Sequence, residues 1–477
     1  MAMSACINGR IREQKLLNQI CNSGQSEFLA VYGRRRVGKT FLIREFFESK
    51  IVFSVAGLAN SGKTEQLQNF GYALNRYRGE SIEKIKRISS WLEAFELLIS
   101  YLESLEVKCK IIFLDELPWM DTPGSDFISS LEHFWNGWAS ARKDIVLIVC
   151  GSATSWMMDK LINNHGGLHN RITRKIHLKP FTLHETETFL ENRLPGLSKY
   201  EIAECYMILG GIPYYLNLLQ KGRSLAQNID ALLFNPDGEL YDEFANLYAS
   251  LFSSSEDYLK VVVALSKKGY GLTRNEISAE TKIPSGSKLT KILSNLENCG
   301  FIRKYYAWGK AKNAGIYQLI DFFTLFYFRF IKKSTFNSLQ YWSSIQGKPE
   351  FYSWAGYSFE LLCLLHEEQI KNALGISGVL TSTFSWRSED YEPGAQIDMV
   401  LLRNDNTINL CEMKFCEGEF KIDKAYEMNL RNKMTAFRME TKCRQSLQLT
   451  LVTTFGLKEN EHSGVVSNQV RMEDLFD

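Results

Sequence analysis

The stretch FLAVYGRRRVGKT, residues 28–40, joins a run of apolar residues to a loop rich in glycine and arginine. The loop fits the pattern of a glycine, four variable residues and Gly-Lys-Ser/Thr, and the residues after it are typical of a helix. In such a loop the backbone amides and the helix N-terminus surround phosphates, the lysine neutralises the outer phosphates, and the hydroxyl binds Mg²⁺. The stretch therefore predicts a P-loop for ATP and Mg²⁺, formed by Gly33, Arg34, Arg35, Arg36, Val37, Gly38, Lys39 and Thr40.

A second stretch, GLANSGKT at residues 57–64, satisfies the same pattern and also follows an apolar run. The first match is favoured because the helix after it, FLIREFF, is apolar enough to be buried under a sheet. The helix after the second match, EQLQNFGYAL, is amphipathic and typical of a surface. Choosing the second match would also leave a complete strand-loop-helix unit without a role. Lys63 is therefore interpreted as a coincidence, although the pattern alone leaves both sites open.

Outward from the loop, short apolar runs alternate with helical stretches as far as about residue 179. The runs cover residues 28–33, 51–57, 110–116 and 144–152. They are continuous rather than alternating, as expected of parallel strands buried on both faces. The pattern predicts an α/β core with a parallel sheet.

An acidic pair, Asp115 and Glu116, ends the third apolar run. Downstream of a P-loop by two strands, such a pair suits the chemistry of nucleotide hydrolysis. Asp115 is expected to hold the Mg²⁺ ion together with Thr40. Glu116 is expected to polarise the attacking water as a general base.

Six segments in this order resemble the archaeal-type, or prokaryotic, ATPases of the AAA+ class. They are NGR (8–10), VYGRRRVGKT (31–40), FLDELPWM (113–120), CGSATSWM (150–157), LHNRITRKIHLKPFTLHE (168–185) and GGIPYYL (210–216). The resemblance implies that Ser152 senses the γ-phosphate and that Arg171 is the arginine finger, with Arg174 as the alternative. It also implies a lid with a Gly-x-Pro in place of a sensor arginine. A finger that acts across a subunit boundary would require a homo-oligomer.

Basic charge is concentrated in residues 256–335, which hold 14 Lys or Arg and 6 Asp or Glu in a chain of net charge +2. Three short helices and a two-stranded ribbon are predicted there, the order of a winged helix-turn-helix. Lys288 and Lys291 fall on the candidate recognition helix, and Lys310 and Lys312 on the wing. This distribution favours contact with the phosphates of DNA. Docking of a protein, or a lid role, is the alternative.

A second constellation of polar residues lies in QIDMVLL and CEMKF near the C-terminus. A hairpin centred near Asp405 would place Asp398 opposite Glu412, with Lys414 on the same face. Two carboxylates and a lysine can bind Mg²⁺ and activate water against a phosphodiester. The arrangement resembles the restriction-endonuclease-like PD-(D/E)XK nucleases, and the resemblance implies Glu360 as a further acid. Glu412 and Lys414 are then catalytic candidates, and Glu360, Asp398 and Glu412 the metal ligands, unless the domain is an inactive relative.

Four domains are expected from these patterns. Residues 1–193 would form the P-loop ATPase core, 194–250 a helical lid, 251–335 the winged helix, and 345–477 an α/β nuclease-like domain. The ten cysteines show no metal-binding spacing. The N-terminus has no apolar stretch typical of a signal peptide, and the most apolar stretch, residues 316–331, is too short to span a bilayer and is expected to be a buried helix. The expectation is a cytoplasmic protein without membrane contact.

The leading hypothesis is an ATPase that couples ATP to DNA binding and metal-dependent DNA cleavage. One alternative is a nucleotide-dependent switch or DNA-binding regulator with an inactive nuclease domain. Another is a protein-remodelling ATPase whose winged helix binds protein.

Overall fold

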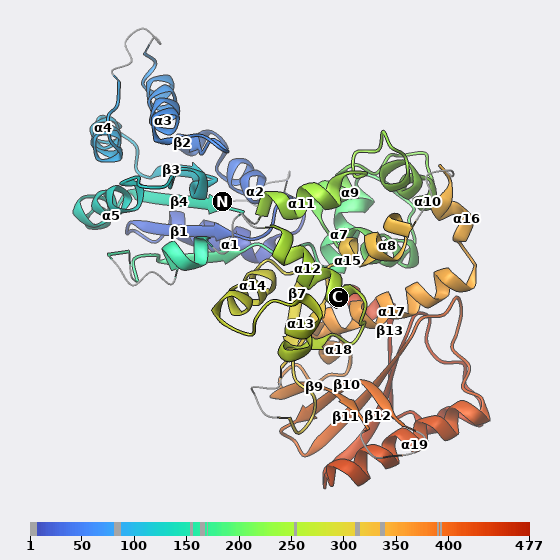
Figure 1. The fold of residues 1–477 in the computed structure, drawn as a ribbon. Helices are drawn as coiled ribbons and strands as arrows, with labels where there is room; N and C mark the ends of the chain where they lie inside the picture. The colour runs from blue at the N-terminus through green and yellow to red at the C-terminus, as the bar shows by residue number, and fades with distance from the viewer. Residues whose placement is uncertain are drawn as a thin grey trace. The chain divides into compact units, whose positions relative to one another are not determined.

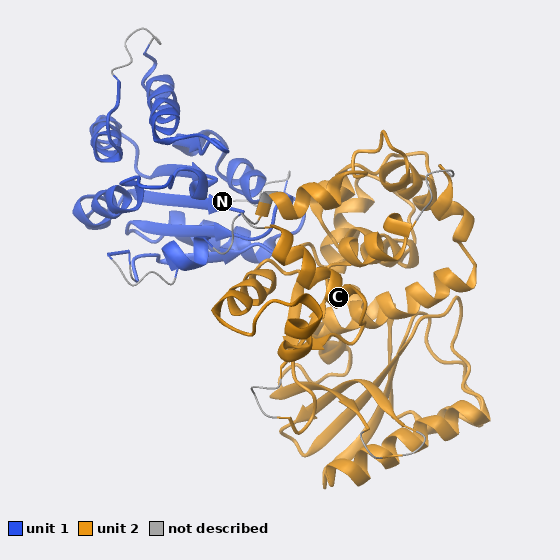
Figure 2. Ribbon diagram, viewed as in Figure 1, with its two compact units in different colours: residues 1–179 blue, residues 180–477 orange. Residues whose placement is uncertain are grey.

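The computed structural model describes most of the chain. The described residues are 7–80, 87–152, 156–162, 167–168, 170–251, 255–310, 315–333, 339–388, 391 and 394–477. They form two compact units, residues 1–179 and 180–477 (Figure 2).

The first unit ends earlier than the boundary at residue 193 that the sequence predicted. The segment that begins at Pro180 packs with the helices that follow it, because the amide of Phe181 donates to the carbonyl of Gly211 at 2.8 Å. Gly211 has a φ of +64°, and a side chain there would meet the Phe181 carbonyl at 2.5 Å. The GGIPYYL segment therefore fixes residues 180–193 to the second unit.

A five-stranded parallel sheet with the order β2-β3-β4-β1-β5 forms the centre of the first unit (Figure 1). Its strands are β1 (Glu27–Tyr32), β2 (Ile51–Ala56), β3 (Lys110–Asp115), β4 (Ile145–Gly151) and β5 (Arg174–His177). The four strands expected from the apolar runs are confirmed. The short β5 was not expected because only one of its four side chains is buried. β1 lies between β4 and the edge strand β5, so the loop that follows it opens beside the end of β4.

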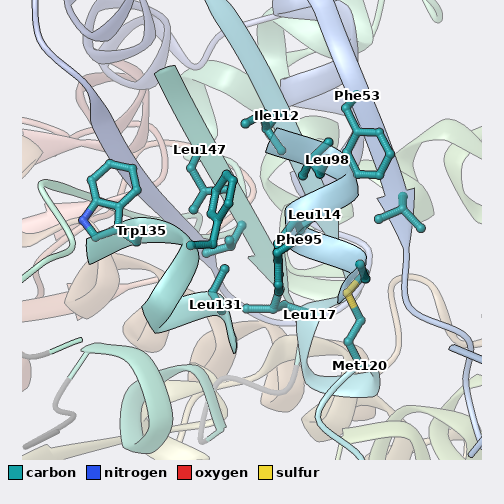
Figure 3. Packing of buried hydrophobic residues seen from close by; sticks show 14 of the residues in the cluster. Phe53, Phe95, Leu98, Ile112, Leu114, Leu117, Met120, Leu131, Trp135 and Leu147 are labelled. Atoms are coloured by element: carbon teal, nitrogen blue, oxygen red, sulfur yellow. The ribbon is translucent and has the colours of Figure 1, made fainter. Parts of the chain in front are cut away.

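The helices of this unit are α1 (Ile11–Cys21), α2 (Lys39–Phe47), α3 (Lys63–Arg78), α4 (Trp91–Glu103) and α5 (Phe127–Gly137). Side chains of α4 and α5 pack against β3 and β4, as Figure 3 shows for Phe95, Leu131, Leu114 and Leu147. All six residues of β3 are buried. This packing holds the carboxyl end of β3, and with it Asp115, in a fixed place.

The second unit begins with helices α7 (Leu183–Glu191), α8 (Lys199–Leu209), α9 (Pro213–Asn217), α10 (Leu225–Ile229) and α11 (Glu243–Leu251). The next elements are α12 (Ser255–Ser266), β6 (Leu272–Thr273), α13 (Arg274–Thr281), α14 (Ser287–Asn298), β7 (Ile302–Tyr305) and β8 (Ile316–Leu319). The three strands form an antiparallel sheet with the order β6-β8-β7. Three helices and a ribbon are thus present where the sequence predicted them.

The last part of the chain is a mixed five-stranded sheet with the order β13-β12-β11-β10-β9. Its elements are α15 (Phe322–Arg329), α16 (Tyr341–Ile345), α17 (Pro349–Leu365), α18 (Glu367–Ala373), β9 (Thr381–Arg387), β10 (Gln396–Arg403), β11 (Thr407–Lys414), α19 (Lys424–Thr441), β12 (Ser446–Thr453) and β13 (Asn468–Arg471). Leu430, Ala436 and Phe437 of α19 pack on the sheet (Figure 1). The expected hairpin is confirmed as β10 and β11, which pair in antiparallel fashion.

Residues 316–331, expected to be one buried helix, are divided between β8 and α15. The division falls at Asp321, whose carboxylate accepts a hydrogen bond from the amide of Thr324 at 3.0 Å and so caps α15. No helix within the described ranges combines the length and apolar character that crossing a membrane requires.

Candidate nucleotide-binding site

The loop between β1 and α2 has the backbone that a phosphate-binding loop requires. Gly33, Arg36 and Gly38 have φ angles of +142°, +69° and +91°. A side chain at Gly33 would meet the Leu178 carbonyl oxygen at 2.3 Å, so only glycine fits there. Lys39, the first residue of α2, is buried, and its Nζ donates to the carbonyls of Gly33 at 2.9 Å and residue 34 at 2.8 Å. The loop therefore wraps around the amino group that the pattern predicted to neutralise phosphates.

The remaining loop residues divide into supporting and exposed positions. Arg34 and Val37 are buried, whereas Arg35 is exposed. Arg10 was quoted only as part of the NGR segment, but it supports the loop directly. It is buried, and its guanidinium donates to the carbonyls of Val37 at 3.2 Å and Lys179 at 2.8 Å. Arg10 thus connects the back of the loop to the last residue of the first unit.

The hydroxyl of Thr40 and the carboxylate of Asp115 lie in direct contact. Thr40 Oγ1 is 2.9 Å from Asp115 Oδ2 and 3.2 Å from Oδ1, a contact that joins the start of α2 to the end of β3. Burial raises the pKa of the Asp115 carboxyl above its ordinary value, while the hydrogen bond from Thr40 lowers it. An anionic oxygen and a hydroxyl oxygen at the edge of a parallel sheet are ligands that suit Mg²⁺, with phosphate oxygens and water completing its coordination. The residues present therefore fit the expected ion.

Glu116 is placed by backbone geometry and by a serine from the neighbouring strand. It has a φ of +45°, which turns the chain sharply at the end of β3. Ser152, just after β4, donates from Oγ to Glu116 Oε1 at 2.5 Å and from its amide to Oε2 at 3.3 Å. The predicted base and the predicted γ-phosphate sensor thus form one pair. The sequence implied a serine that contacts phosphate, and here that serine holds the base.

The second glycine-rich match has a different geometry. Gly62 has an extended backbone with a φ of −81°, and α3 begins directly after it. The Nζ of Lys63 lies 2.7 Å from the Asp126 carboxylate, in an ion pair at the surface. The amino group is therefore directed to an acid rather than to its own loop, which supports the choice of residues 33–40.

The two candidate arginine fingers lie at the other end of the sheet. Arg174 begins β5 and pairs with Leu29 near the start of β1, whereas the loop follows the end of β1. From Leu29, the partner of Arg174, to Gly33 at the start of the loop is four residues, or about 13 Å at about 3.3 Å per residue. Arg171 is exposed, and Arg174 lies 3.9 Å from the buried carboxylate of Glu27. Arg171 lies before the start of β5, away from the end of β1 where the loop begins.

The C-terminal constellation is brought together on β10 and β11. Met399 pairs with Cys411, which places Asp398 opposite Glu412 as the hairpin predicted. Asp398 Oδ2 accepts a hydrogen bond from the amide of Met413 at 2.9 Å. Glu412 is fully buried, and its Oε1 has no hydrogen-bond partner among the described residues. Burial, followed by the charge of Asp398, raises the pKa of Glu412 to about 7.

A second lysine contacts this glutamate, and the sequence did not predict it. Lys433 Nζ of α19 lies 2.6 Å from Glu412 Oε2, whereas Lys414 Nζ lies 3.9 Å from the same oxygen. Lys433 belongs to no short pattern with the β-strand acids, because it is 21 residues away on a helix. Only the fold brings it to Glu412.

The expected three-carboxylate metal site is not preformed. Within the described part of the chain, no three Cys, His, Asp or Glu side chains are already grouped to hold one ion, so Glu360 as a third ligand beside Asp398 and Glu412 stays a prediction. The physical reason is that Glu412 is held by Lys433 and Asp398 by a backbone amide. Burial, followed by the charge of Asp398, raises the pKa of Glu360 to about 8, so its proton already relieves the repulsion.

The lysines that are expected to contact DNA differ in their interactions within the protein. Lys288, on α14, lies 2.6 Å from the Asp257 carboxylate and is therefore already paired. Lys291 and Lys310 also have interactions within the protein. Lys312 lies outside the described residues. Paired lysines contribute less to phosphate binding, so contact with DNA remains a prediction.

Comparisons with known proteins find a family similar to the first part of the chain. Residues 8–219 match a family described as an ATPase domain predominantly from Archaea. An uncharacterized protein of Methanocaldococcus jannaschii is 28% identical over 330 residues, which are 68% of each chain.

Two solved structures have similar folds. A Walker-type ATPase of Pyrococcus abyssi is 19% identical, with a TM-score of 0.49 over 67% of this chain and 95% of the other. The Aeropyrum pernix ORC2 protein, in complexes with ADPNP and ADP, is 14% identical, with a TM-score of 0.41 over 65% and 90%. Both overall similarities are low, so they carry no further argument. Residues 8–219 are similar to an ATPase domain predominantly from Archaea, and the geometry of the loop at residues 33–40 agrees with that similarity.

Proposed function

We propose that this protein binds ATP with Mg²⁺ at the loop of residues 33–40 and hydrolyses it. The contact between Thr40 and Asp115, next to the buried Lys39 amino group, is the observation that carries the proposal. It places a metal-binding oxygen pair and a phosphate-binding cation at one edge of the sheet. A structural ion pair elsewhere in the unit, such as that of Lys63, lacks the surrounding loop amides.

Each residue then has a role that follows from its position. Lys39 exchanges its hydrogen bonds to loop carbonyls for the outer phosphates, and the amides of residues 33–38 enclose the charge. Thr40 and Asp115 hold Mg²⁺, which neutralises charge on the phosphates. Glu116 accepts a proton from the attacking water, and Ser152 keeps its carboxylate oriented. Arg10 holds the loop in place through its hydrogen bonds to the carbonyls of Val37 and Lys179.

Glu116→Gln is expected to separate binding from hydrolysis. A positioned general base contributes about 10²–10⁴-fold to a rate, so phosphate release should fall by that factor while ATP affinity stays near that of the wild type. Phosphate release and titration calorimetry with ATP and Mg²⁺ measure the two quantities. Glu106→Gln, which removes an exposed carboxylate from the same unit, is the matched control. Equal hydrolysis by both variants would reject Glu116 as the base.

Arg171 is proposed to complete the site of another copy of this chain. An arginine finger contributes about 10³–10⁵-fold to hydrolysis, and Arg171→Ala should lose that factor. Mixing Arg171→Ala with Lys39→Ala should restore hydrolysis that neither shows alone, since a mixed oligomer can pair an intact loop with an intact arginine. Arg174→Ala should retain activity. A mixture that stays inactive while both proteins form oligomers would contradict action between subunits.

A second function is favoured by the carboxylates of the C-terminal sheet. Asp398 and Glu412 lie opposite each other, Glu412 has an unpartnered buried oxygen, and two lysines lie nearby. Mg²⁺ is commonly held by one or two carboxylates together with substrate phosphate, so two acids suffice. We propose metal-dependent cleavage of DNA here, controlled by ATP, with the region of α12–β8 as a winged helix that contacts DNA. If the protein does not cleave DNA, the alternatives are a DNA-binding regulator without nuclease activity or a protein-remodelling ATPase.

A further inference from the structure

A cavity of about 500 Å³ lies within the second unit, between the β7–β8 ribbon and the C-terminal sheet. Residues of the ribbon, of helices α17 and α19, and of strands β9 and β10 line it. Asp398 and Glu360 are among them, so the cavity opens onto the carboxylates proposed to bind metal. Its volume lies in the range of sites that enclose a small ligand.

The ribbon is attached to the sheet by backbone hydrogen bonds. The amide of Trp308 donates to the carbonyl of Ser385 at 2.9 Å, and the amide of Ser385 donates to the carbonyl of Tyr306 at 3.3 Å. Ser385 belongs to β9, the edge strand of the sheet, so residues 306–308 extend that edge. The hydroxyl of Tyr357 on α17 donates to the carbonyl of Gly269 at 3.1 Å from another side. The ribbon is therefore a fixed wall of the cavity.

Cations and aromatic rings from both parts line this wall. Arg303 of β7 donates from Nε to Gln318 at 2.8 Å and lies over the Tyr305 ring at 4.8 Å. Arg387 of β9 is exposed at the cavity and lies over the Tyr270 ring at 5.6 Å. Guanidinium groups beside aromatic surfaces are the chemistry that holds the phosphates and bases of single-stranded nucleic acid. A stack of paired bases is too wide for such a cavity, whereas one unpaired nucleotide fits.

The acids of the cavity do not oppose such a ligand as strongly as their number suggests. Glu440, a further acid of the lining, accepts a hydrogen bond from the amide of Tyr391 at 3.0 Å. Asp398 already accepts a hydrogen bond from the backbone, and it lies on the side of the cavity toward Glu412.

We propose that this cavity binds one unpaired nucleotide of single-stranded DNA, with Arg387 and Arg303 at its phosphate and the Tyr305–Trp308 segment against its base. The ribbon predicted as a DNA-binding wing then forms part of the cleavage site itself. The inference rests on the proposed cleavage function only for the fate of the DNA, because binding requires no reaction.

Binding of a fluorescent dT₁₂ strand to the full-length protein in EDTA tests the proposal, because metal-dependent cleavage is absent there. Arg387→Gln should weaken binding about tenfold, which corresponds to about 1.4 kcal/mol, because the phosphate loses a charged hydrogen-bond donor. Arg444→Gln removes an equally exposed arginine outside the cavity and should bind as the wild type does. Blunt duplex DNA should compete poorly. Equal binding by the two variants, or equal competition by duplex, would overturn the proposal.

A cross-link locates the bound strand. A dT₁₂ strand that carries 5-iododeoxyuridine should cross-link on irradiation to the ribbon segment of residues 305–308, and the cross-link should be lost in Arg387→Gln. Cross-links found only on α14 would assign binding to the predicted recognition helix and refute the cavity. If the cross-link forms but no DNA is cleaved with Mg²⁺ or Mn²⁺, the cleavage function fails while the binding site stands.

Discussion

Replacing Lys39 by alanine is expected to abolish ATP hydrolysis, with a loss of about 10²–10³-fold or more, the factor typical of one preorganised charge-stabilising group. Lys39 Nζ is buried inside its own loop and is held by two carbonyl oxygens. Of the three arginines in the same loop, Arg35 is exposed. The phosphates of ATP would therefore meet the loop without their principal counter-charge.

Lys63→Ala is the matched control, since it removes a lysine from the same sequence pattern. Its ion pair with Asp126 is at the surface, where such a pair contributes roughly 0–1 kcal/mol, so hydrolysis should be retained. Phosphate release gives the rates, and thermal unfolding gives an independent measure of binding. ATP at 100 times its Kd should stabilise the wild type and Lys63→Ala by about 2.7 kcal/mol but should leave Lys39→Ala unshifted. The opposite result would move the nucleotide to residues 57–64.

The contrast between the two lysines shows what could be predicted from the sequence. The strand-loop-helix order and four of the strands follow from local apolar patterns, and they are confirmed, although only two of the six residues of the edge strand β2 are buried. β5 could not be predicted because it is four residues long and mostly exposed, and is defined by its pairing with β1. The end of the first unit depends on a hydrogen bond between residues 181 and 211, which no local pattern contains.

The same contrast between local patterns and distant contacts applies to the residues of the two candidate sites. Asp115, Glu116 and Thr40 could be predicted because each stands at the end of a recognisable strand or the start of a helix. The support from Arg10, the hydrogen bond between Ser152 and Glu116, and the approach of Lys433 to Glu412 are contacts between distant segments. They depend on packing rather than on spacing. The three-carboxylate site stays a prediction for the same reason, because the sequence does not show which cations and amides compete for each acid.

Glu412→Gln is expected to abolish Mg²⁺-dependent DNA cleavage. The ion contributes several kcal/mol of charge stabilisation to the reaction, which corresponds to about 10³-fold or more in rate. Glutamine has the same shape as glutamate but is neutral, so the buried site would lose a ligand charge with little change in volume. Plasmid or oligonucleotide cleavage with Mg²⁺ or Mn²⁺ measures the effect, and Glu419→Gln, at an exposed position shortly after β11, is the control. Cleavage that survives in Glu412→Gln would locate the activity elsewhere.

Lys433 gives this prediction a second, independent test. Its amino group is the cation nearest to Glu412, and removing one partner of a buried pair leaves an uncompensated charge that costs about 3–5 kcal/mol. Lys433→Met should therefore destabilise the domain in urea and reduce cleavage, while Lys433→Arg should restore both in part, because it returns the charge. Lys414, at 3.9 Å, forms the weaker contact, so Lys414→Met should reduce cleavage with little loss of stability if its role lies in the reaction. Loss of stability in both variants with no effect of either on cleavage would make the cluster purely structural, since a reacting lysine and a supporting lysine must differ in which quantity they change.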